Sequence, residues 1–172
     1  LLCHDAHMLI FVGMQVGNLA DAGRGAAVMA DLVDDVLVEP PATHMMMTLE
    51  GYLSTVAHVD IRFGRWQAVL DTAFAGDPAC RPVSWAMHHY ARAVASAALG
   101  WTEAAQEAAR GFAAACAAVP ADYAFFNNPA GAILAVADLM MRGEMAYHAG
   151  DVETGFDLLR RAAAAEDDLG YN

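Results

Sequence analysis

The histidines are the residues of this sequence whose side chains are best suited to binding a metal ion. Four of the seven histidines, His4, His7, His58 and His148, fall on predicted helix faces that we expect to line one groove. His4 and His7 are three residues apart, a spacing that puts two imidazoles on the same side of a helix. Imidazole is a common ligand of zinc and other transition metals. The pair could therefore direct two ring nitrogens at one divalent cation.

A complete metal site needs ligands from other helices as well. His58 and Glu144 occupy the same groove face of two other predicted helices, so the candidate metal ligands are His4, His7, His58 and Glu144. A divalent transition metal with an open coordination position would polarise a substrate or lower the pKa of bound water. This set predicts a metal-dependent enzyme or metal-binding protein. We prefer the other interpretation, a polar peptide-binding groove whose histidines hydrogen-bond to a ligand or to water, with no cofactor.

Other catalytic signatures are absent from the sequence. It contains no Gly-x-Ser-x-Gly elbow, no phosphate-binding loop, no Gly-x-Gly-x-x-Gly turn and no His-Glu-x-x-His helix. The enzyme hypothesis therefore depends on the metal site alone, and we expect a binding protein in preference to a catalyst.

The charge balance and the cysteines narrow the classes of partner. The net charge is -12 at pH 7, and all nine basic residues are arginines. A negative surface repels nucleic-acid phosphates and anionic membranes, and no uninterrupted apolar run reaches the ~18 residues of a membrane span. Cys3, Cys80 and Cys116 lack the spacing of a disulfide framework or zinc knuckle, which indicates reduced thiols. We expect a cytoplasmic protein that binds a protein or peptide.

One stretch shows how the helices are arranged. Residues 85–119 are rich in alanine, and Gly100 separates two helical patterns within them. Glycine at this place allows the positive φ that commonly ends a helix. The same turn pattern recurs at Gly17, Gly64 and Gly150. Four such turns predict four antiparallel helical hairpins.

These hairpins divide the whole chain. We expect them over about residues 1–39, 43–76, 83–119 and 128–169, with prolines in the breaks between them. The turn glycines are farther apart than the ~34 residues of a tetratricopeptide repeat, so longer connections join the units. The sequence predicts one all-α repeat domain over residues 1–172, a right-handed superhelical array of about four tetratricopeptide-like hairpins.

Local signals predict where individual helices begin and end. Pro40 and Pro41 end the first hairpin, and the second helix of the second hairpin is expected over residues 66–75. Asn128 followed by Pro129 predicts an N-cap and the first helical residue of the last hairpin.

The two ends of the sequence bear on its completeness. The chain begins at Leu1 instead of a methionine and stops at Asn172, directly after a helical pattern. We therefore expect a fragment of a longer repeat protein, with further repeats of the same chain as neighbours.

Four sequence motifs, or phrases, resemble those of a bacterial family of tetratricopeptide-repeat proteins of uncharacterised activity. In that family an HN-x-HF-like phrase opens one repeat, RFGRW closes the next, and phrases like HYARGVAxAALG and GExAYxxG follow. The matching phrases here are HDAHM at residues 4–8, RFGRW at 62–66, HYARAVASAALG at 89–100 and GEMAYHAG at 143–150. The first departs from the family, with Asp5 and Met8 in place of Asn and Phe. The resemblance spans nearly the whole chain and implies an intracellular repeat architecture and a binding role.

The repeat architecture predicts which helix faces meet a ligand. In stacked hairpins the first helix of each repeat lines the concave surface, and residues three or four apart share one helix face. The positions chosen in this way are His4, His7, Phe11 and Gln15, then Gly51, Ser54, His58 and Arg62, then Met87, Tyr90, Val94 and Ala98, and last Ala137, Met140, Glu144 and His148. The expected ligand contacts are His4, His7, His58, Arg62, Tyr90, Glu144 and His148. We predict a peptide-binding module that acts through this groove.

Overall fold

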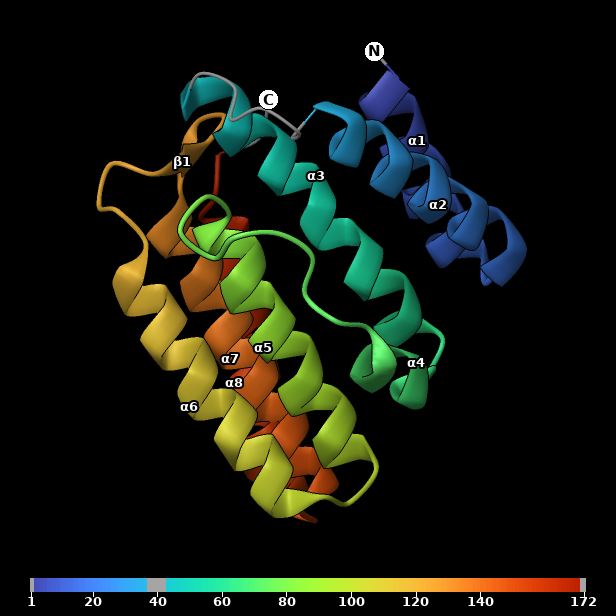
Figure 1. Ribbon diagram of the computed structural model, residues 1–172. Helices are drawn as coiled ribbons and strands as arrows, with labels where there is room; N and C mark the ends of the chain where they lie inside the picture. The colour runs from blue at the N-terminus through green and yellow to red at the C-terminus, as the bar shows by residue number, and fades with distance from the viewer. Residues whose placement is uncertain (1, 37–42, 171–172) are drawn as a thin grey trace.

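The computed structural model describes residues 2–36 and 43–170, and these residues form an all-α protein with one short β-hairpin (Figure 1). The described helices are α1 (Leu2–Val16), α2 (Leu19–Val36), α3 (Thr43–Arg62), α4 (Trp66–Asp71), α5 (Pro82–Ala98), α6 (Thr102–Ala118), α7 (Ala130–His148) and α8 (Val152–Asp167). Strands β1 (Ala124–Phe125) and β2 (Asn128–Pro129) pair antiparallel between α6 and α7. The pairs α1–α2, α5–α6 and α7–α8 pack as antiparallel hairpins. Among the described helices, none is both long and apolar enough to cross a membrane.

The four predicted turn glycines are confirmed as helix-to-helix corners. Gly17, Gly64, Gly100 and Gly150 have φ angles of 72°, 66°, 76° and 91°, in the left-handed region that a Cβ disfavours. After Gly100, the amide of Trp101 donates to a carbonyl five residues earlier at 2.8 Å, which is the bond that closes a helix C-terminus. The chain therefore reverses at each place that the glycine pattern predicted.

The second hairpin is less regular than expected. The helix predicted over residues 66–75 ends at Asp71, because Thr72 has an extended backbone and its hydroxyl donates to the carbonyl of Ala68 at 2.8 Å. The six residues of α4 therefore cover much less of α3 than a full-length partner helix would. The predicted break at Pro40 and Pro41 lies outside the described residues.

The last hairpin also begins differently from the prediction. Asn128 is not an N-cap: it belongs to β2, and α7 begins at Ala130. The Asn128 side chain instead exchanges two hydrogen bonds with the backbone of Gly170, each 2.8 Å long. The Asn128 amide thus satisfies a donor and an acceptor of the segment that follows α8.

Glycines allow the paired helices to approach closely. A Cβ at Gly13 of α1 would lie 2.6 Å from the backbone nitrogen of Ala22 on α2. A Cβ at Gly143 of α7 would lie 2.8 Å from the side chain of Leu159 on α8. These distances are shorter than ordinary carbon contacts, so a Cβ would displace the backbone of α2 at Gly13 and the Leu159 side chain at Gly143.

The helices bury two separate hydrophobic clusters, which we call the N-terminal core and the C-terminal core. The N-terminal core joins α1, α2 and α3 around Ile10 and Met29. The C-terminal core joins α5, α6 and α7 around Tyr90, Phe112 and Met141. Helix α3 lies between them, and it gives buried residues to the first and partly buried residues to the second.

Candidate functional site

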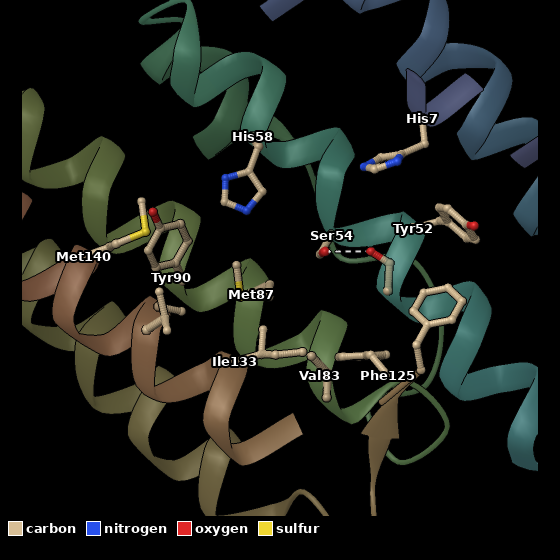
Figure 2. Close-up of a pocket in the computed structure, with 14 residues that line it drawn as sticks. His7, Tyr52, Ser54, His58, Val83, Met87, Tyr90, Phe125, Ile133 and Met140 are labelled. Carbon is tan, nitrogen blue, oxygen red and sulfur yellow. Dashed lines mark hydrogen bonds between the residues drawn. The ribbon is translucent and has the colours of Figure 1, made fainter. Parts of the chain in front are cut away.

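A cavity of about 290 Å³ opens where the two cores meet (Figure 2). Its walls come from α1, α3, α5 and α7, the first helices of the four predicted hairpins, and from the β1–β2 hairpin. Half of the positions chosen from helical periodicity line it, namely His7, Gly51, Ser54, His58, Met87, Tyr90, Ala137 and Met140. The lining is mostly apolar with a few polar groups, a composition typical of ligand sites.

One side of the cavity is formed by His7 and two aromatic residues. His7 reaches from α1 toward α3, where its ring centroid lies 5.6 Å from that of Tyr52 in an edge-on contact (Figure 2). Tyr52 in turn meets the ring of Phe126 at 6.2 Å. Burial lowers the pKa of His7, and repulsion from His4 lowers this pKa further. The imidazole is therefore neutral at pH 7, with one nitrogen to donate and one to accept a hydrogen bond.

The opposite side carries His58 and Tyr90, whose ring centroids are 5.8 Å apart. Burial lowers the pKa of His58. Burial also raises the pKa of Tyr90, and the nearby carboxylate of Glu144 raises it further. Both groups are thus uncharged near neutral pH, so the cavity offers hydrogen-bonding side chains without charge.

Glu144 and His148 lie beside the cavity, outside its lining. Glu144 follows Met140 by one turn of α7, and its Oε2 lies 3.6 Å from Nε2 of His148. The two side chains are 35% and 27% exposed. The ring of His148 also meets that of Trp66 at 6.5 Å. A negative charge therefore lies next to Tyr90, one turn beyond the edge of the cavity.

Besides Glu144 and His148, two more predicted contact residues, His4 and Arg62, do not line the cavity. The His4 side chain is 63% exposed, and its Nδ1 lies 3.8 Å from a carboxylate oxygen of Asp5. Arg62 is exposed at the last residue of α3. Helical periodicity placed both on the correct helices, but the cavity ends before it reaches them.

The four predicted metal ligands are not brought together. His7 and His58 line one cavity, whereas His4 turns to Asp5 and Glu144 pairs with His148. Among the residues whose side chains the structure describes, 2–32 and 47–170, no three His, Cys, Asp or Glu side chains lie close enough to hold a metal ion. The spacing of His4 and His7 on one helix was not sufficient, because the other ligands had to come from helices whose separation the sequence does not specify.

Glu50, which no sequence pattern singled out, is a buried carboxyl group that joins the two cores. Glu50 is 1% exposed on α3. Its Oε1 accepts the backbone N–H of Ser84 in the first turn of α5 at 2.6 Å, and its Oε2 accepts the hydroxyl of Tyr123 at 2.5 Å. Burial raises the pKa of Glu50 in spite of these bonds. Glu50 thus caps a helix from a distance, where Arg81 at the N-cap makes no side-chain cap.

The β1–β2 hairpin supplies two further residues that the sequence analysis missed. Tyr123, held by Glu50, begins the segment that places Phe125 against α3, where a Cβ at Gly51 would lie 3.2 Å from the Phe125 ring. Phe126 is 60% exposed at the cavity and has a φ of 51°, a left-handed conformation that is costly for a residue with a Cβ. Aromatic residues in a short connection between helices were the signal that could have revealed them.

Comparison with known proteins finds no matching family model, no matching curated protein and no matching solved structure. The resemblance of the four sequence phrases to a repeat family therefore stays a prediction.

Proposed function

We propose that this protein is a peptide-binding module of tetratricopeptide-like hairpins in a right-handed superhelical array, and that its cavity holds one large apolar side chain of the bound segment. The arrangement of helices supports the proposal. Helices α1, α3, α5 and α7 contact one another in chain order and line the same cavity. Stacked helical hairpins use this surface for recognition.

The size of the cavity is the observation that most strongly supports the proposal. Its volume of about 290 Å³ is at the lower limit of the ~300–1,000 Å³ typical of small-molecule sites. It is roughly twice the ~150 Å³ of an engineered cavity that takes up benzene. One indole, phenol or branched aliphatic side chain fits this space, whereas most cofactors do not. A peptide would bury one such side chain here and lie along the adjoining helices.

The rim of the cavity has the properties of a recognition surface. Phe126 exposes most of its ring beside Tyr52, and its backbone conformation is strained. Strained residues persist where the surrounding structure holds them, and they concentrate at ligand sites. Exposed aromatic side chains next to a pocket supply much of the free energy of binding in many interfaces. Phe126 and Tyr52 therefore suit a contact with the residue that flanks the anchor.

Charge adds a second requirement for the ligand. Glu144 lies one turn of α7 beyond Met140, and the whole chain carries a net charge of -12. A basic residue close to the apolar anchor would meet Glu144 and would also be attracted by the overall field. The proposed ligand is therefore a segment with a large apolar side chain followed or preceded by lysine or arginine.

Selection from a random peptide display library tests this proposal. We expect enrichment of peptides with one large apolar residue at a fixed position and a basic residue nearby. Met140→Trp fills the cavity from a side chain that is 36% exposed, so it should weaken binding of the selected peptides at least tenfold. Val152→Trp, on an exposed position of α8 outside the cavity, is the matched control and should bind normally.

Two results would overturn the proposal. One is a selection that enriches no peptide above uncoated support. The other is equal binding of the selected peptides to wild type and Met140→Trp. Calorimetric titration of the purified variants distinguishes these outcomes, and circular dichroism verifies that each variant is folded.

A further inference from the structure

A second cavity lies on the other side of α3. Its volume is about 250 Å³, and its walls come mainly from α3, α4, α5 and the connecting segment 72–81. This segment runs back across the molecule to the start of α5 (Figure 1). Ser54 and Met87 line both cavities. The two spaces are therefore neighbours with a thin common wall.

The charged and titratable groups at this second cavity are already satisfied within the protein. Asp60 lies 3.3 Å from Arg65, and Arg81 donates to the carbonyl of Ala75 at 3.2 Å. Burial, together with electrostatic repulsion from Arg92 and His89, lowers the pKa of His88 to about 4, so this imidazole is neutral at pH 7. A charged occupant would lose its hydration without meeting an opposite charge in need of a partner. The occupant that fits is uncharged.

The cavity has an aromatic side that favours a flat occupant. Phe74, in the connecting segment, has its ring centroid 5.6 Å from that of His88, and both residues line the cavity. Behind them, Trp85 stacks on His88 at 5.5 Å with only 10° between the planes, and meets Phe74 edge-on at 4.9 Å. Rings prefer offset-stacked or edge-on neighbours, so a further ring can extend this cluster into the cavity.

We propose that this second cavity is a binding site for an uncharged aromatic ligand of one or two fused rings. The volume of about 250 Å³ exceeds the ~150 Å³ that accommodates one benzene and suits a bicyclic ring. Leu53, Val56 and Val69 supply the apolar walls. Met87 is the flexible part of the common wall, because an unbranched thioether side chain adapts its shape to what lies beside it. The site is separate from the proposed peptide groove and does not depend on it.

Indole is a suitable probe, and methyl groups report which cavity it enters. Leu53 and Val69 line the second cavity alone, whereas Ile133 lines the first alone. In methyl NMR spectra of the full chain, indole should shift Leu53 and Val69 in a saturable manner, with a dissociation constant in the millimolar range or tighter, as expected for so few atoms. The shift at Ile133 should be smaller.

Substitutions that fill each cavity make the test decisive. Ala57→Phe should weaken indole binding at least tenfold, and Ala73→Trp, from an exposed position of the connecting segment, should do the same if Ala57→Phe does not fold. Met140→Trp, which fills the first cavity, should leave indole binding unchanged. Three results would each overturn the assignment. The first is a saturable shift at Ile133 alone, and the second is equal indole affinity in wild type and the variants that fill the second cavity. The third is no saturable shift up to 10 mM indole, a concentration roughly ten times a millimolar dissociation constant.

Discussion

Helices α3 and α5 occupy comparable positions in the chain but have different surroundings. Both are the first helix of a predicted hairpin, yet residues 93–97 of α5 are all buried, whereas residues 51–58 of α3 are all only partly buried. Helix α5 packs against α6 along its length, while the partner of α3 is α4, which has six residues. Both cavities border α3. A helix that its hairpin partner covers incompletely thus leaves space where ligands can bind.

The strongest test of this comparison removes the link between the two cores. Glu50→Ala leaves the amide of Ser84 and the hydroxyl of Tyr123 without their partner and creates a void in a 1% exposed position. We expect a loss of about 3 kcal/mol or more in the free energy of unfolding, measured with urea.

Glu50→Gln is the matched control for this prediction. It preserves the shape and one acceptor oxygen, and burial raises the pKa of Glu50 and so opposes its charged form, so the cost should be less than about 1 kcal/mol. Equal stability of the alanine and glutamine variants would show that the hydrogen bonds of Glu50 do not join the cores.

A smaller effect is expected within the N-terminal core alone. Gly13→Ala would force a Cβ to within 2.6 Å of the backbone of α2 and should cost about 2 kcal/mol. Gly23→Ala, on the same hairpin, meets no atom within 4 Å and should stabilise the helix by up to about 1 kcal/mol. Hydrogen exchange should accelerate in α1 and α2 of Gly13→Ala and leave α5–α8 protected. Acceleration throughout the chain would mean that the two cores unfold as one unit.

The smallest expected effect is on the pH dependence of stability, to which His58 and Glu50 of α3 contribute in opposite directions. The pKa of His58 is lowered from 6.5, so its contribution to stability is present above pH 6.5 and lost as the pH falls through its folded-state pKa. The pKa of Glu50 is raised from 4.5, so its contribution is present below pH 4.5 and lost as the pH rises through its folded-state pKa. Between pH 4.5 and pH 6.5, the two groups therefore change the free energy of unfolding in opposite directions as the pH falls.

Glu50→Gln should reveal this opposition. With the contribution of Glu50 removed, acidification from pH 6.5 to pH 4.5 should destabilise the variant more than wild type, by about 1 kcal/mol for each unit of pKa shift removed. Urea unfolding at several pH values measures the difference. Parallel pH profiles for the two proteins would contradict the assigned direction for Glu50.

The candidate site shows which of its residues sequence patterns can predict and which they cannot. Periodicity placed His7, His58 and Tyr90 on helix faces that do line the cavity. It could not show that His4 and Arg62 extend beyond its ends, because the distance between helices depends on every side chain at their interface. The same dependence separated the four predicted metal ligands. The phenylalanines of the β1–β2 hairpin were missed because a loop has no period from which a direction can be calculated.

The sequence by itself determined where the helical hairpins of this protein reverse. Glycines at positions 17, 64, 100 and 150 set the reversals, because the left-handed conformation excludes most other residues and needs no distant contact. The tertiary structure alone decided where space remains between the helices. Glu50 meets Ser84 and Tyr123, which are far from it in the chain. Cavities result from such long-range packing, and local rules do not determine it.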